Sequence, residues 1–218
     1  MTSPVVAMPN PQGGGLSAIA TSTPPSRLPS ILGMYAFAAA TFVVAANMAH
    51  WYGGAQSAIV LFPLVLFFGL AEFYAAAWAF RTNDAIAVAM HGTWGAFWTA
   101  YGILELLYSN GKVAHTQATF SELGFWFIVI AAITWGITAA SRNNEVRTVL
   151  GLLAIGATLE AIAELTGVEG LRMLAGYFLI ASSLVAWYVA SAVMVRFTRQ
   201  IKSPTVTSVA PGETARVA

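Results

Sequence analysis

The chain has 218 residues, of which 58% are hydrophobic and 9% charged, with a formal net charge of +1 and a mean hydropathy of +0.71. Soluble domains contain about a quarter charged residues, so this composition excludes a soluble globular protein and predicts an integral membrane protein. The cations are few and scattered, which argues against a nucleic-acid partner. The absence of cysteine excludes disulfides and thiol chemistry.

Both ends of the chain are polar. Residues 1–30 are rich in Pro, Gly, Ser and Thr and contain no apolar run of signal-peptide length. Residues 201–218 have the same polar character. We therefore expect a disordered tail at each end of a single transmembrane domain over residues 31–200.

Within that domain, apolar segments alternate with short polar breaks. A helix needs about 20 apolar residues to cross the roughly 30 Å hydrocarbon core, and six segments meet this need. They are 31–51, 58–80, 84–108, 120–141, 146–165 and 172–197. The fifth is the least apolar because it carries Glu160, Glu164 and two glycines. The predicted fold is an all-α integral membrane protein with six transmembrane helices.

The distribution of Lys and Arg predicts the orientation. Eight of these residues fall on one side of the six segments and two, Lys112 and Arg172, on the other. The eight are Arg27, Arg81, Arg142, Arg147, Arg196, Arg199, Lys202 and Arg216. Both termini are therefore predicted to be cytoplasmic, in a cytoplasmic membrane. An even number of spans likewise requires that the two termini share a side.

The second and third segments are predicted to form a hairpin around a short turn near Thr82. Glu72 lies ten residues before the turn and His91 nine after it, so both lie roughly 14 Å deep at ~1.5 Å per residue. Ionisable groups at that depth usually face a partner or a water-filled cavity. We expect Glu72 and His91 to be in contact or bridged by water. They either form part of a substrate or proton path, or only tie two helices together by a hydrogen bond.

Acidic residues fall inside the predicted spans, whereas no Lys or Arg falls well inside one. A pore for a fully charged anion would offer basic side chains. The pattern instead favours a weak acid that crosses with a proton, or a small neutral solute. Glu105 and Glu164 lie close enough to segment ends to reach the surface or the mouth of a pore.

Signals for other functions are weak. The chain has no nucleophile elbow, phosphate-binding glycine loop or paired histidines at metal spacing, so we expect no enzyme activity, metal or cofactor. A chromophore-binding sensor is disfavoured because no span carries a lysine for a Schiff base. A purely structural membrane protein would have no continuous polar path among its helices.

The third segment contains a specific motif. His91-Gly92-Thr93-Trp94-Gly95-Ala96-Phe97-Trp98 resembles the serine/threonine–aromatic–Gly–small–Phe–Trp signature of the acetate uptake transporter family, also called the succinate–acetate permeases. Further matching stretches follow in the family's order. They are Gly69-Leu70-Ala71, Thr166-Gly167, Ala175-Gly176-Tyr177 and Ala186-Trp187-Tyr188. The resemblance covers about residues 28–197.

The chain also departs from the family pattern. Of the motif Asn-Pro-Ala-Pro-Leu-Gly-Leu before the first helix, only Pro29, Leu32 and Gly33 match. Glu72 replaces the usual Gln, and His91 replaces an apolar or aromatic residue. These changes concern the substrate rather than the fold.

The resemblance implies a six-helix protomer with its own pore, assembled as a homo-hexamer, for acetate and related small monocarboxylates or succinate, by proton symport or as a channel. The family's pore is narrowest at an apolar constriction, whose residues correspond to Phe37, Trp94 and Ile155 here. An apolar constriction rejects a hydrated anion unless the anion sheds water or takes a proton.

Three polar residues lie near enough in their helices to offer hydrogen bonds around such a constriction: Thr41, Asn47 and Thr93. The sequence therefore predicts a transporter or channel for acetate and related small monocarboxylates, with protons and the lipid bilayer as its other partners. The alternative is a channel for a small neutral solute such as ammonia, urea or a short amide.

Overall fold

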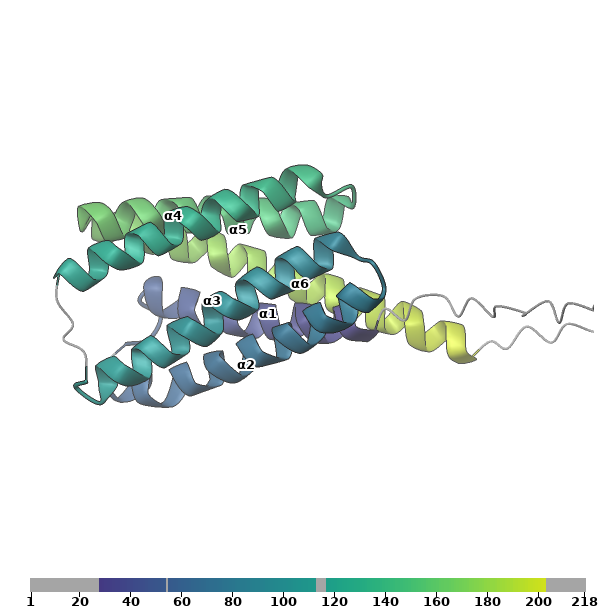
Figure 1. Ribbon diagram of the computed structural model, residues 1–218, viewed down its shortest axis with the longest axis horizontal. Helices are drawn as coiled ribbons and strands as arrows, with labels where there is room; N and C mark the ends of the chain where they lie inside the picture. The colour runs from purple at the N-terminus through teal and green to yellow at the C-terminus, as the bar shows by residue number, and fades with distance from the viewer. Residues whose placement is uncertain (1–27, 54, 113–116, 203–218) are drawn as a thin grey trace, which may run out of the picture.

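The computed structural model describes residues 28–53, 55–112 and 117–202, which form six α-helices and no strand (Figure 1). The helices are α1 Leu28–Met48, α2 Ala55–Arg81, α3 Ala85–Ser109, α4 Gln117–Ala140, α5 Asn144–Thr166 and α6 Glu169–Lys202. The predicted all-α fold with six helices is confirmed. The predicted disordered tails lie outside the described residues except for 28–30 and 201–202, which are helical.

The helix ends differ from the predicted segments by a few residues. The first helix begins at Leu28 and ends at Met48, and residues 49–52 form a turn in which His50 has φ 58°. The last helix runs from Glu169 to Lys202, beyond the predicted 172–197 at both ends. Hydropathy detects only the apolar part of a helix, whereas backbone hydrogen bonding continues into its polar ends.

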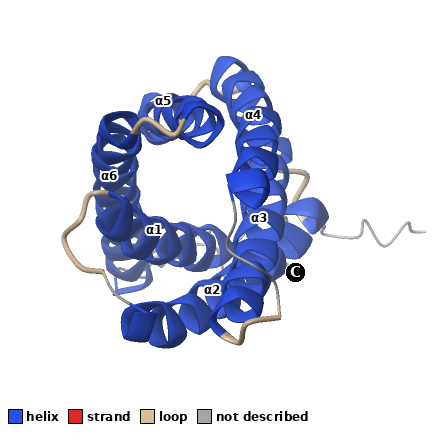
Figure 2. Cartoon of the chain, turned by 90° about the vertical axis from the view of Figure 1, so that its left-hand side faces the viewer, coloured by secondary structure: helices blue, strands red, loops and turns tan. Residues whose placement is uncertain are grey.

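The start of α1, the end of α6 and the α2–α3 and α4–α5 turns lie at one end of the bundle, called here the terminal side (Figure 1). The other end, called the far side, holds the end of α1, the start of α2, the end of α3, the start of α4 and the α5–α6 turn. Viewed along the bundle, α1, α3, α4, α5 and α6 surround a central axis, and α2 packs outside them against α1 and α3 (Figure 2). Residues on the inner faces of five helices can therefore meet at one axis.

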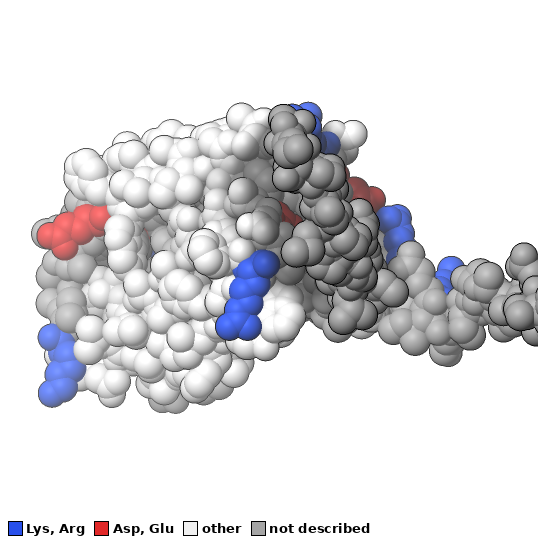
Figure 3. Space-filling view, turned by 45° about the vertical axis from the view of Figure 1, so that its right-hand side comes forward, with Lys and Arg blue, Asp and Glu red and all other residues white. Residues whose placement is uncertain are grey.

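The outer surface of the bundle is apolar. Large side chains such as Phe67, Phe80 and Tyr188 are exposed, and in Figure 3 uncharged residues cover a broad band while charged ones lie mainly toward the two ends. Five of the six helices are long and apolar enough to cross a membrane. The exception, α3, carries His91 and Tyr101 on a face buried inside the bundle. The chain is a multi-pass membrane protein.

Glycines let α2 and α3 approach closely. A Cβ atom added to Gly95 would lie 2.9 Å from the Gly69 carbonyl oxygen and 3.2 Å from the Phe73 backbone nitrogen. Such contacts with backbone cannot be relieved by turning a side chain, so the two helices would have to move apart. This close approach positions the residues that α2 and α3 share.

We expect Gly95→Ala to destabilise the protein by about 1–3 kcal/mol, the usual cost of overpacking a buried site. Thermal unfolding in detergent, followed by circular dichroism, measures this change. Gly136→Ala is the matched control because a Cβ there meets nothing within 4 Å. An equal effect of both substitutions would show that the α2–α3 approach is not responsible.

Candidate functional site: an apolar neck and a buried acid–imidazole pair

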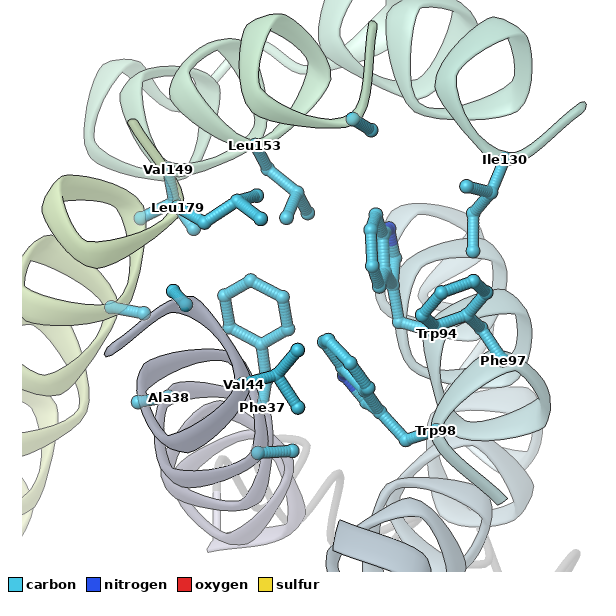
Figure 4. Close-up of a cluster of buried hydrophobic side chains, with 14 of the residues drawn as sticks. Phe37, Ala38, Val44, Trp94, Phe97, Trp98, Ile130, Val149, Leu153 and Leu179 are labelled. Atoms are coloured by element: carbon cyan, nitrogen blue, oxygen red, sulfur yellow. The ribbon is translucent and has the colours of Figure 1, made fainter. Parts of the chain in front are cut away.

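Three side chains from different helices converge on the central axis. Phe37 of α1, Trp94 of α3 and Leu153 of α5 point toward one another across it (Figure 4). Phe37 and Leu153 are 0% exposed and Trp94 is 1% exposed. The Phe37 and Trp94 rings meet edge to face, with centroids 6.1 Å apart. We call these three residues the neck.

One hydrogen bond and packing against two neighbouring rings hold Trp94 in the neck. Its indole Nε1–H donates to the Thr134 hydroxyl on α4 at 3.1 Å, and that hydroxyl donates to the Ile130 carbonyl at 2.6 Å. On its other side the ring packs on Phe97 and Trp98, with centroids 5.2 and 5.5 Å away. With its polar edge satisfied by α4, the indole presents an apolar face to the axis.

The third predicted constriction residue, Ile155, lies elsewhere. It is half-buried and does not belong to the buried apolar cluster, whereas Leu153 does. Two residues along a helix turn the side chain by about 200°, so Leu153 and Ile155 face different directions. The sequence did carry a usable signal, because Leu153 lies seven residues before Glu160 and therefore shares its helix face.

The three polar residues predicted around the constriction do not all lie near the neck. Thr41 is 0% exposed and lies one turn along α1 from Phe37, and its hydroxyl has no hydrogen-bond partner among the described residues. Thr93 is half-buried. The Asn47 amide donates to the Tyr52 carbonyl at 3.3 Å, about 15 Å along the helix from Phe37. Asn47 therefore stabilises the turn after α1 rather than the neck.

Sequence reasoning missed Trp98. It follows Trp94 by one helical turn, is buried, and points toward the same axis (Figure 4). Its indole N–H, like the Thr41 hydroxyl, has no hydrogen-bond partner among the described residues. The four-residue spacing of Trp94 and Trp98 was the available signal. Two polar groups thus lie just beyond an apolar ring, where a small polar solute could bind.

Glu72 and His91 form a buried pair beside the neck. The Glu72 Oε2 and His91 Nδ1 atoms are 3.2 Å apart, and the side chains are 0% and 1% exposed. The other polar atoms, Glu72 Oε1 and His91 Nε2, have no hydrogen-bond partner within the described residues. A proton can therefore be held between the two groups, out of contact with water.

The short α2–α3 turn sets the register of this pair. Asn83 adopts a left-handed conformation with φ 55°, and the Asp84 carboxylate caps α3 by accepting the Ala87 N–H at 3.0 Å. Across the pair, Gly33 of α1 leaves room for the imidazole, since a Cβ there would lie 2.5 Å from His91 Nε2. The pair thus occupies the junction of α1, α2 and α3.

A hollow of about 610 Å³ opens on the terminal side of the neck. Its lining includes Met34, one turn from Phe37, and the turns before α3 and α5. The charged residues of the lining are balanced, two acidic and two basic: Asp84, Glu145, Arg142 and Arg196. A small solute can therefore approach to within one helical turn of the neck from this side without crossing lipid. Within the described residues, no cluster of three or more His, Asp or Glu forms a candidate metal site.

Several known proteins are similar to this chain in sequence. Residues 7–209 match the GPR1/FUN34/yaaH family. The chain is 24% identical to Ammonia transport outward protein 2 of Saccharomyces cerevisiae over 165 residues, which are 73% of this chain but only 58% of the yeast protein. It is 26% identical over 189 residues to Acetate transporter protein patA of Aspergillus clavatus, covering 80% of this chain and 76% of that protein.

The fold also resembles that of a solved protein. The structure of the bacterial acetate channel SatP superposes with a TM-score of 0.68 at 16% sequence identity, over 78% of this chain and 93% of that one. At this level of identity the likeness concerns the fold alone.

Proposed function

The chain belongs to the GPR1/FUN34/yaaH family, and we propose that it passes acetate and related small monocarboxylates, or succinate, across the cytoplasmic membrane. The family resemblance found in the sequence is thereby confirmed. We infer that the chain acts as a membrane transporter or channel rather than as an enzyme, as the relatives' names and the shared fold suggest. The choice of substrate, the link to protons and the orientation of the chain belong to the proposal.

The observation that carries the proposal is the neck. Phe37, Trp94 and Leu153 close the axis with apolar surface, and an apolar constriction is crossed most easily by a solute that sheds little hydration. A small carboxylic acid in its neutral form meets this requirement, and the Thr41 and Trp98 polar groups beyond the neck can bind its carboxyl. A relative named an acetate transporter favours acetate as the first substrate.

We further propose that transport is linked to protons, that both termini are cytoplasmic and that the protein assembles as a homo-hexamer. The Glu72–His91 pair can hold a proton beside the neck, which suits a solute that crosses as a neutral acid. The excess of Lys and Arg at the terminal side supports the proposed orientation, with both termini in the cytoplasm. The expected homo-hexamer is implied by the family resemblance.

Uptake of labelled acetate into proteoliposomes tests the proposal. We expect the purified protein to raise the initial rate at least tenfold over protein-free vesicles, a change corresponding to ~1.4 kcal/mol in barrier height. Phe67→Ala is the matched control variant, because this ring is 66% exposed on the outer surface of α2. A rate equal to that of empty vesicles would refute acetate transport.

A channel for a small neutral solute is the second candidate. It is favoured by the apolar neck and by the likeness to a yeast protein named for ammonia transport. Vesicle swelling in urea and in acetamide, compared with acetate uptake, separates the two. Rapid permeation of the neutral solutes without acetate uptake would favour this second candidate.

A further inference from the structure

A second group of charged residues lies at the far side of the bundle, away from the pair already described. Glu160 and Glu164 of α5 are one helical turn apart and face Arg172 of α6. The Arg172 Nε atom is 3.7 Å from Glu160 Oε1, and its Nη1 atom is 3.6 Å from Glu164 Oε1. Both carboxylate side chains are almost fully buried, at 2% and 3% exposed, whereas the arginine is 27% exposed.

Two residues of α3 join this group. The Tyr101 hydroxyl donates a hydrogen bond to the half-buried Glu105 carboxylate, and Glu105 interacts electrostatically with Arg172 and Glu164. We call Glu105, Glu160, Glu164 and Arg172 the far cluster. Glu169, at the start of α6, adds negative charge close to it.

The far cluster lies on the same faces of α3 and α5 that contribute Trp94 and Leu153 to the neck. On α5, Glu160 and Glu164 follow Leu153 by seven and eleven residues, which keeps them on its face. On α3, Tyr101 and Glu105 follow Trp94 by the same intervals. At ~1.5 Å per residue the first carboxylate lies roughly 10 Å beyond the neck. A solute that leaves the neck toward the far side therefore passes this cluster.

The far cluster has more negative than positive groups. Three carboxylates share one guanidinium, and Glu160 Oε2 is buried without a hydrogen-bond partner among the described residues. The hollow on the terminal side differs, because its two acidic and two basic residues balance. The two sides of the neck thus carry different charge.

We propose that the far cluster is a charge filter, in which Glu105, Glu160 and Glu164 repel ionised carboxylates and admit the neutral acid. This inference rests on the proposed transport of small carboxylic acids. Charges of like sign repel one another strongly where little water screens them. Such repulsion holds back an anion while leaving an uncharged molecule of equal size unaffected.

The test compares acetate with acetamide in proteoliposomes at roughly pH 7, where a small carboxylic acid is almost wholly ionised. The variant E160Q/E164Q keeps the shape of both side chains and removes two negative charges. We expect its acetate flux to rise at least tenfold, because the anion can then reach the neck and take up a proton there, and its acetamide flux to stay at the wild-type level. Glu122→Gln is the matched control, because this exposed glutamate of α4 lies outside the far cluster.

A second variant separates charge from folding. E160Q/E164Q leaves Arg172 without its two α5 carboxylates, so E160Q/E164Q/R172Q is also measured, with elution from a sizing column as the check on folding. The filter predicts that acetate flux is lowest in the wild-type protein, higher in the triple variant and highest in E160Q/E164Q.

Three outcomes would overturn the filter. An unchanged ratio of acetate to acetamide flux in a folded variant would show that the cluster exerts no charge selection. Parallel loss of both fluxes would assign it a structural role only. Absence of acetate flux in the wild-type protein would instead refute the proposed function, and the filter with it.

Discussion

Replacing Phe37 by alanine is expected to widen the neck and to raise the flux of monocarboxylates bulkier than acetate at least tenfold. The Phe37 ring is fully buried and meets Trp94 edge to face across the axis. Truncation removes most of one wall of an apolar constriction, so water can enter and larger solutes can pass. A tenfold rise in flux corresponds to a free-energy barrier that is lower by ~1.4 kcal/mol.

The measurement is uptake of acetate and butyrate into proteoliposomes, expressed as a ratio. Phe37→Leu keeps an aliphatic wall and should change the ratio less than alanine does. Phe67→Ala on the outer surface should not change it at all. If Phe37→Ala lowers both fluxes in proportion, the ring supports helix packing and does not set the width of a pore.

Replacing His91 by leucine is expected to destabilise the protein by about 3 kcal/mol, the lower end of the range for removing one member of a buried ion pair. Glu72 is 0% exposed and its second carboxylate oxygen already has no partner within the described residues, so the substitution leaves the whole carboxyl group unsatisfied. Glu72→Gln still offers an oxygen to the imidazole and should cost less than about 1 kcal/mol.

Thermal unfolding in detergent, together with the double variant E72L/H91L, gives a sharp test. Removing both polar groups should restore much of the stability lost in the single His91 variant, because no buried carboxyl remains without a partner. A double variant no more stable than His91→Leu would mean that the imidazole contributes by its shape against Gly33 rather than by its bond to Glu72.

Much of the architecture could be predicted from the sequence. The six helices and the membrane class follow from stretches of about 20 apolar residues, a local property of the chain. The contact between Glu72 and His91 followed from their equal distance to a short turn, because antiparallel neighbours place such residues at the same depth. The family followed from the motif around Trp94, and the match over residues 7–209 confirms it.

The candidate site was predicted less completely. Phe37 and Trp94 were named from the resemblance and do converge on the axis, but Leu153 rather than Ile155 joins them (Figure 4). Asn47 binds the Tyr52 carbonyl at the end of α1, and Trp98 was not predicted. The differences at Ile155 and Trp98 concern the direction in which a side chain points, because hydropathy along a nearly uniform apolar helix carries little information about rotation. The difference at Asn47 concerns depth, since this residue lies about 15 Å along α1 from Phe37.

By itself the sequence determined that this chain crosses a membrane as helices, where its turns lie, and that an acid and an imidazole share one depth. Only the tertiary structure decided which residues of α1, α3 and α5 face the axis, that Gly33 makes room for His91, and that Arg172 meets two glutamates of α5. The physical reason is that helix formation depends on neighbours within four residues, whereas the rotation of each helix is set by contacts with helices distant in the chain.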